Sequence, residues 1–162
     1  QHAREFHESG IPFLFDPGQG LPMFSGTELH NLIKQSDYVT VNDYESQLLQ
    51  ERTECTLEEL AKLVKGLIVT KGAQGSVIFS NDKQIDIPCV KSDEQLDPTG
   101  CGDAYRAGLL YGIANQMDWQ ATGQLGSLMG ALKISQRGGQ NHSFSSEEIA
   151  QRYFEEFGSR IP

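Results

Sequence analysis

Short apolar runs alternate with longer helical patterns along the first half of the chain. The runs at 11–16, 38–41 and 67–70 consist mainly of aromatic and aliphatic residues, as buried strands do. When strands alternate with helices, each helix carries the chain back along the sheet, so that successive strands run parallel. The alternation therefore predicts an α/β fold, in which a mostly parallel sheet is packed between helices.

Caps and glycines mark the ends of the predicted helices. Thr27 is the expected N-cap of a helix over 27–36, and Gly66 is expected to end the helix before the third strand. Capping-box spacing, in which a hydroxyl residue precedes a glutamate by three positions, predicts helix starts at Thr56–Glu59 and Ser145–Glu148. The remaining predicted elements are strands over 76–80 and 83–90, which form a small meander, and helices over 3–9, 43–51, from 103 to about 115, 118–136 and 145–157.

Small residues recur on one face of the helix that follows residue 103. Ala104, Gly108 and Gly112 are spaced by four, which predicts close packing against a neighbouring helix or the sheet. The same pattern can occur in membrane helices, but polar residues such as Arg106 and Lys133 interrupt the two helices concerned. We therefore interpret these helices as part of a soluble fold.

Composition and charge exclude several functional classes. The 162 residues carry a net charge of −9, which argues against partners such as nucleic acid or an anionic membrane. No apolar run approaches the roughly 18 residues that a membrane span needs. Cys55, Cys89 and Cys101 are far apart, as expected for reduced thiols in a cytoplasmic protein. We predict that residues 1–162 form a single domain, and part of a larger one, because the chain opens in the middle of the alternating pattern.

Four polar or glycine-rich segments follow predicted strands or open a helix. They are DPGQG at 16–20, NDYE at 42–45, TKGAQG at 70–75 and DPTGCGD at 97–103. In open parallel sheets, ligands bind beyond the carboxyl ends of the strands. The recurrence of such segments at equivalent ends predicts a ligand site there.

The segment DPTGCGD carries the most specific chemistry. Backbone amides at a helix N-terminus bind anions, and glycines let a phosphate approach the backbone closely. Asp103 would then accept the proton of a hydroxyl group during phosphoryl transfer. The alternative, that Asp103 only stabilises the first helical turn, is equally compatible with this stretch alone.

Two further segments have both a chemical and a purely structural interpretation. Asn42 and Glu45 lie one helical turn apart and suit Mg²⁺ held partly through water, although a helix cap followed by a glutamate is the commoner reason for that pattern. Thr70 and the turn after it suit phosphate or ribose oxygens, but a plain hairpin turn looks the same. The Walker and Rossmann glycine patterns are absent, which argues against P-loop hydrolases and nicotinamide enzymes.

In this order and at these separations, NDYE, TKGAQG and DPTGCGDAYRAG resemble the carboxyl-terminal half of the ribokinase / phosphofructokinase-B (PfkB) family of sugar and nucleoside kinases. The residues of these motifs are most similar to those of the adenosine-kinase-like branch and of general carbohydrate kinases. Pro98, Cys101 and Tyr105 depart from the usual signature without removing Asp103 or its glycines. The resemblance implies a three-layer α/β/α ribokinase-like fold, with a mostly parallel sheet and a small β-meander.

The resemblance also implies a role for each matching position. Asp103 would be the general base, and the backbone amides of Gly100, Cys101 and Gly102 would hold the transferring γ-phosphoryl group. Arg106 is not a usual family position, and a surface salt bridge is its expected role. We interpret Cys101 as a small residue and not as a redox thiol.

Three groups of residues would bind ligands, according to the same resemblance. Those for the nucleotide are Thr70, Gly72, Gly75, Gly139, Asn141 and His142. Those for Mg²⁺ and phosphate are Asn42, Glu45 and Asp16. Those that hold a monovalent cation, K⁺, in some members are Asp97 and Thr99.

The implied activity is ATP-dependent phosphorylation of a hydroxymethyl group on a sugar or nucleoside. Two alternatives stay open, namely a nucleotide-binding or regulatory module without turnover and a ribokinase- or fructokinase-type enzyme with another sugar acceptor. Family members carry an amino-terminal half with the acceptor site and a β-sheet lid, through which many of them form homodimers, and that half is absent here. This chain alone is therefore not expected to be a competent kinase.

Overall fold

The computed structural model describes residues 1–92, 94–141 and 143–162. The chain divides into two compact units. The first comprises Gln1–Gly72 and Ser76–Asp86, and the second comprises Ala73–Gly75 and Ile87–Pro162. Each unit is described by itself.

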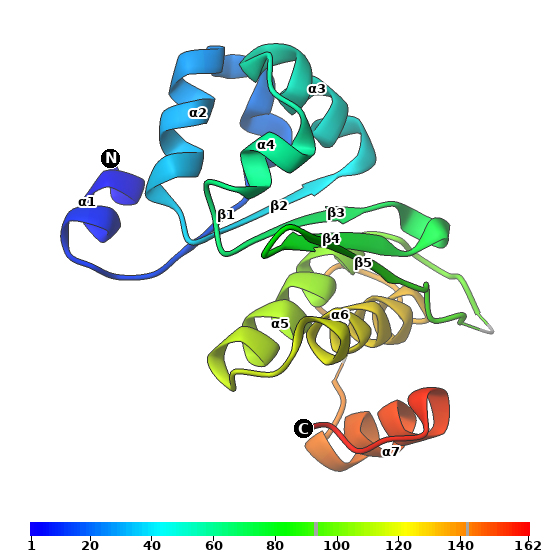
Figure 1. Ribbon diagram of the computed structural model, residues 1–162. Coiled ribbons are helices and arrows are strands. Elements are labelled where there is room, and N and C mark those ends of the chain that lie inside the picture. The colour runs from blue at the N-terminus through cyan, green and yellow to red at the C-terminus, as the bar shows by residue number, and fades with distance from the viewer. Residues whose placement is uncertain (93, 142) are drawn as a thin grey trace. The chain divides into compact units, whose positions relative to one another are not determined.

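The first unit is built on a five-stranded sheet whose spatial order equals the chain order (Figure 1). Its strands are β1 (Leu14–Phe15), β2 (Tyr38–Asn42), β3 (Gly66–Thr70), β4 (Ser76–Ser80) and β5 (Lys83–Ile87). β1, β2 and β3 run parallel, and β4 pairs with β3 in the antiparallel direction. This arrangement confirms a mostly parallel sheet with a small meander. β5 is shorter than predicted because it ends before Pro88, which has no amide hydrogen to donate to a ladder.

Helices of the first unit cover one side of these strands. Figure 1 shows α2 (Gly26–Gln35), α3 (Asp43–Thr53) and α4 (Leu57–Ala61) together on that side. α1 (His2–Glu8) contacts α2, and the short 3₁₀ segments η1 (Gly18–Met23) and η2 (Gly72–Gln74) follow β1 and β3.

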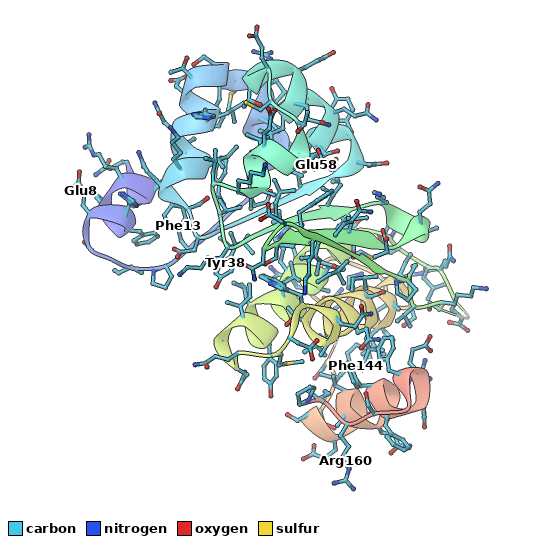
Figure 2. The ribbon with its side chains drawn as sticks, viewed as in Figure 1. Glu8, Phe13, Tyr38, Glu58, Phe144 and Arg160 are labelled. Carbon is cyan, nitrogen blue, oxygen red and sulfur yellow. The ribbon has the colours of Figure 1, made fainter. Side chains whose placement is uncertain are left out.

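The core of the first unit lies between the sheet and these helices. Alternate strand residues point into it, and each such buried side chain contributes about 1.5–3 kcal/mol to folding. Figure 2 labels Phe13 and Tyr38, which lie side by side where the first two strands begin, and the Tyr38 amide donates to the Phe13 carbonyl at 3.3 Å. The main core residues are Leu29, Ile33, Val39, Val41, Leu49, Leu60, Leu67, Val69, Val77 and Phe79.

Two predicted helix ends are wrong. The N-cap of α2 is Ser25 and not Thr27, because the Ser25 hydroxyl accepts from the Glu28 amide at 3.3 Å and the Glu28 carboxylate accepts from the Ser25 amide at 2.8 Å. Gly66 does not end a helix, since α4 stops at Ala61 and Gly66 begins β3. The capping boxes predicted for α4 and for α7 are confirmed.

The described residues of the second unit form three helices, α5 (Cys101–Ala114), α6 (Trp119–Ile134) and α7 (Ser146–Phe157). α5 and α6 pack so closely that a Cβ on Gly108 would lie 2.7 Å from the Gly126 Cα atom. The predicted close packing through small residues is therefore confirmed. α7 is held against α6 by Tyr153, which is buried and donates to Gln124 Oε1 at 3.0 Å. Across the described residues, no helix combines the length and the apolar character of a membrane crossing.

Candidate functional site

Three of the predicted site residues lie at the carboxyl ends of parallel strands in the first unit. Asp16 follows β1, Asn42 ends β2 and Thr70 ends β3. Asn42 lies directly opposite Thr70 in the ladder, and the Thr70 hydroxyl donates to the Val41 carbonyl at 3.5 Å. These residues therefore share the edge of the sheet at which α/β proteins bind ligands.

Asn42 and Glu45 form a capping box at the start of α3. Asn42 Oδ1 accepts from the Glu45 amide, and Glu45 Oε2 accepts from the Asn42 amide, both at 2.8 Å. These bonds satisfy two amides that a helix N-terminus would otherwise leave without partners. The helix-capping interpretation of NDYE is thus confirmed, and magnesium binding at this position stays a prediction.

The donor set at this edge fits a hard cation. The capping box uses one oxygen of the Glu45 carboxylate, and Asp16 Oδ1 accepts from the Gly18 amide at 2.9 Å. Carboxylate and amide oxygens that hold Mg²⁺ partly through water are its usual protein partners. Within the part of the chain that the structure describes, no cluster of three His, Cys, Asp or Glu side chains could hold a metal by itself.

The turn after β3 contains two glycines with positive φ. Gly72 has φ +54° and open space around it, whereas Gly75 has φ +86° and faces other backbone. A Cβ on Gly75 would lie 2.1 Å from the Ile87 carbonyl oxygen and 2.9 Å from the Cys89 nitrogen. Gly75 is therefore required for local packing, and the roles of Thr70, Gly72 and Gly75 toward a nucleotide stay predictions.

α5 begins without a side-chain cap. Its N-cap is Gly100, at φ +82°, and a Cβ there would lie 2.8 Å from the Gly139 carbonyl oxygen. Among residues 1–92, 94–141 and 143–162, no acceptor is found for the amides of Gly102 and Asp103. An uncapped helix N-terminus with free amides, next to glycines, is the geometry that binds phosphate groups.

The Asp103 carboxylate is exposed, and its partner is a side chain of α5 and not a backbone amide. Its side chain is 77% exposed, and Asp103 Oδ1 accepts from the Arg106 guanidinium one turn later. The expected surface salt bridge of Arg106 is confirmed. Burial raises the pKa of the half-buried Cys101 thiol, whereas a reactive thiolate needs a lowered one, so the thiol behaves as a small packing residue.

The segment before α5 is held against the loop after α6. Asp97 Oδ1 accepts from the Thr99 amide at 2.9 Å, and Asp97 Oδ2 accepts from the Gly138 amide at 2.8 Å. Hydrogen bonds from the side chain and amide of Thr99, and then from Gly138, lower the pKa of Asp97 to about 2. Thr99 and Gly100 both contact Gly139. The structure thus brings the predicted cation residues, the anion-hole residues and the predicted adenine loop together.

Residues at the end of that loop are placed in part. Asn141 lies against Gly138, which has φ +78°, and the Asn141 side chain occupies the space that a Gly138 Cβ would need. His142 lies outside the described residues. The roles of Gly139, Asn141 and His142 toward adenine stay predictions.

Lys133 is a residue of this site that the sequence analysis missed. Its side chain is fully buried, and Nζ donates to the Gln136 carbonyl at 3.0 Å and to the Asp97 carbonyl at 3.4 Å. The carbonyl oxygen and both carboxylate oxygens of Asp97 therefore already accept hydrogen bonds from the chain. Because the positive Lys133 ammonium group lies at the Asp97 carbonyl, Asp97 does not fit a separately bound K⁺, and the cation role of Thr99 stays a prediction.

A family model described as pfkB family carbohydrate kinase matches residues 1–146. The chain belongs to the pfkB carbohydrate kinase family. It is 34% identical to a nucleoside kinase of Methanocaldococcus jannaschii over 85% of this chain and 46% of that protein. It is 46% identical to a solved nucleoside kinase of Burkholderia thailandensis in complex with inosine, with a TM-score of 0.97 over 99% of this chain and 52% of the other.

These likenesses confirm the ribokinase-like α/β fold. A ribokinase from Thermotoga maritima has a TM-score of 0.76 at 20% identity, over 93% of this chain and 52% of that one, which shows a common fold alone. A second structure of the Burkholderia kinase is a complex with ADP-inosine. The chain spans about half the length of the relatives that it matches.

Proposed function

We propose that this chain forms the phosphoryl-transfer half of an ATP-dependent kinase, in which Asp103 is the general base. The observation that carries the proposal is the start of α5, where an exposed carboxylate stands beside backbone amides that have no acceptor in the described part of the chain. In an enzyme of this class, such amides stabilise negative charge on the transferring phosphoryl group.

The proton and the phosphoryl group move in opposite directions in this reaction. The Asp103 carboxylate takes the proton of the acceptor hydroxyl, whose oxygen then bonds to the γ-phosphorus as the bond to ADP breaks. The amides of Gly100 and Gly102 would face the phosphoryl oxygens, whereas the Cys101 amide already donates to the Pro98 carbonyl at 3.1 Å. Mg²⁺, held near Asn42, Glu45 and Asp16, would neutralise phosphate charge when it is bound.

We infer that the acceptor is a nucleoside, phosphorylated on its hydroxymethyl group. The support comes from similarity, since two relatives at 34% and 46% identity are nucleoside kinases and the second was solved with inosine. A sugar acceptor is the second candidate, because the family as a whole is described as carbohydrate kinases. A nucleoside differs from a sugar by its base. An enzyme that binds the base would prefer a nucleoside to a sugar as its acceptor.

The test is a panel of acceptors offered to the protein translated from its complete open reading frame. ADP release is measured with inosine, adenosine, ribose and fructose in turn, in the presence of ATP and Mg²⁺. The proposal expects kcat/KM to be highest for a nucleoside. A preference for ribose or fructose would leave the kinase assignment intact and contradict the nucleoside, and no ADP release with any acceptor would contradict both.

A further inference from the structure

Lys133 places a buried positive charge under the segment that leads to Asp103. It belongs to the last turn of α6, and its side chain has no exposed surface. A buried ammonium group is costly unless carbonyl or carboxylate oxygens surround it. Here two carbonyl oxygens accept from Nζ, those of Gln136 at 3.0 Å and of Asp97 at 3.4 Å.

The position at the end of α6 explains only part of this geometry. A lysine in a last turn commonly bonds to the final carbonyls of its own helix and interacts with the negative end of the helix dipole. The bond to Gln136, two residues beyond the end of α6, is a local contact of this kind. That role does not account for the bond to Asp97, which lies 36 residues earlier in the chain, or for full burial.

The contacts of Lys133 join two segments that build the candidate site. The amides of Leu96 and Asp97 donate to the Ile134 carbonyl at 2.9 and 3.2 Å, which ties the 96–97 segment to the end of α6. The Asp97 carboxylate accepts from Gly138 in the loop after that helix. The negative Asp97 carboxylate and the positive Lys133 attract each other across this junction.

We propose that the Lys133 ammonium takes the place of a bound monovalent cation at this junction and positions the 97–103 segment. The proposal deepens the proposed function and rests on it for the effect on catalysis. Carbonyl and carboxylate oxygens are the groups that replace the water around K⁺ in proteins. An ammonium group carries the same charge, and because the chain itself supplies it, the site is filled at every salt composition.

The first measurement compares salts with the unaltered protein translated from its complete open reading frame. Melting temperature and kcat/KM are measured in potassium chloride and in choline chloride at equal ionic strength, since choline is too large for a site of this size. The proposal expects no difference in either quantity. A higher melting temperature or a faster reaction in potassium chloride would overturn it.

The second measurement removes the charge. Lys133→Ala leaves oxygens around an empty space, and loss of one partner from a buried polar cluster is expected to lower the melting temperature by about 10 °C in choline chloride. Potassium chloride should restore part of that loss, and the recovery should grow with its concentration. Lys133→Met fills the space without a charge, so it should lose stability and show no recovery.

Lys91→Ala, which removes an exposed lysine from the same unit, is the matched control and should respond to neither salt. An unchanged melting temperature of Lys133→Ala in choline chloride, or equal recovery of the Ala and Met variants in potassium chloride, would contradict the proposal. If Lys133→Ala yields no folded protein, the comparison of salts with the unaltered protein still decides. Melting temperature does not depend on turnover, so a failure of the kinase assignment is separately visible.

Discussion

α3, in the first unit, and α5, in the second, each begin at a segment that the sequence predicts to bind ligands, and both carry an acidic residue at the third helical position. In α3, the Glu45 carboxylate accepts from the Asn42 amide, and the Asn42 side chain accepts from the Glu45 amide. In α5, the N-cap is Gly100, which has no side chain, and the Asp103 carboxylate points away to Arg106. The carboxylate at the third position therefore caps the helix in α3, whereas in α5 it is exposed to solvent.

We interpret this difference as a helix N-terminus left available for a ligand in α5. Four helices, α2, α3, α4 and α7, close their first turn with a capping box. A cap contributes about 1 kcal/mol, so leaving it out lowers stability unless another interaction replaces it. At α5 that interaction is a phosphate in our account, and the tie between the 97–103 segment and the 138–141 loop fixes the geometry beforehand.

The largest expected effect is the loss of turnover when Asp103 loses its carboxylate. Asp103→Asn keeps the shape of the side chain but removes the base, so turnover should fall by about 10²–10⁴-fold. The unfolding free energy should change by less than about 1 kcal/mol, because only an exposed ion pair is weakened. Steady-state kinetics and denaturant unfolding measure the two quantities.

Glu59→Gln is the matched control for Asp103→Asn. Glu59 stands at the third position of α4, where its carboxylate accepts from the Thr56 amide at 2.8 Å. Turnover should not change in this variant. Near-normal turnover of Asp103→Asn, or an equal loss in Glu59→Gln, would contradict the assignment of the base.

The next effect concerns the shape of the uncapped helix start. Gly100→Ala introduces a Cβ at φ +82°, where it would meet the Gly139 carbonyl oxygen at 2.8 Å. Left-handed strain and displacement of the loop should together cost about 1–3 kcal/mol and weaken ATP binding. Denaturant unfolding and calorimetry measure these changes.

Gly158→Ala provides the comparison for the backbone strain alone. Gly158 has φ +69° at the end of α7 and no atom within 4 Å of a built Cβ. The Gly158→Ala variant should lose about 1 kcal/mol of unfolding free energy and bind ATP normally. If both variants lose the same stability, the close approach of Gly100 to Gly139 is not important.

The smallest effect tests whether α3 only needs its cap. Asn42→Ala should destabilise the chain by about 1 kcal/mol, as Thr56→Ala should in the capping box of α4, whereas Asn42→Ser keeps a capping oxygen and should be nearly neutral. Unfolding of the three variants measures this. If Asn42→Ser retains stability but loses turnover at low Mg²⁺, Asn42 also contributes to the metal site, and full turnover would restrict it to capping.

Local sequence patterns predicted much of the fold. Short apolar runs located β2, β3 and β4 to within a residue, because strands and caps depend on neighbours in the chain. The N-cap of α2 was predictable in principle, because Ser25 and Glu28 have the same capping-box spacing as Thr56 and Glu59. The prediction of Thr27 overlooked that spacing. Gly66 was misread because a glycine can end a helix or begin a strand that packs closely.

Tertiary contacts could not be predicted in the same way. The hydrogen bond between Lys133 and Asp97 joins residues that are 36 positions apart in the chain. Nothing in the sequence around Lys133 distinguishes it from an exposed lysine. The ion pair between Asp103 and Arg106 follows from a spacing of three on one helix, so it was foreseeable. Asp103 and Arg106, whose contact follows from helix geometry, were thus predicted. Lys133, whose contact depends on how distant segments meet, was missed.

The most direct test of the account observes the helix amides themselves. The protein from its complete reading frame is labelled with ¹⁵N-glycine, and its amide resonances are followed as an ATP analogue with a non-transferable γ-phosphoryl group and Mg²⁺ are added. Gly102, in the first turn of α5, should shift and become protected from exchange, whereas Gly26, in the first turn of the capped helix α2, should not. An unmoved Gly102 resonance at saturating analogue would contradict the claim that the uncapped start of α5 binds the phosphoryl group.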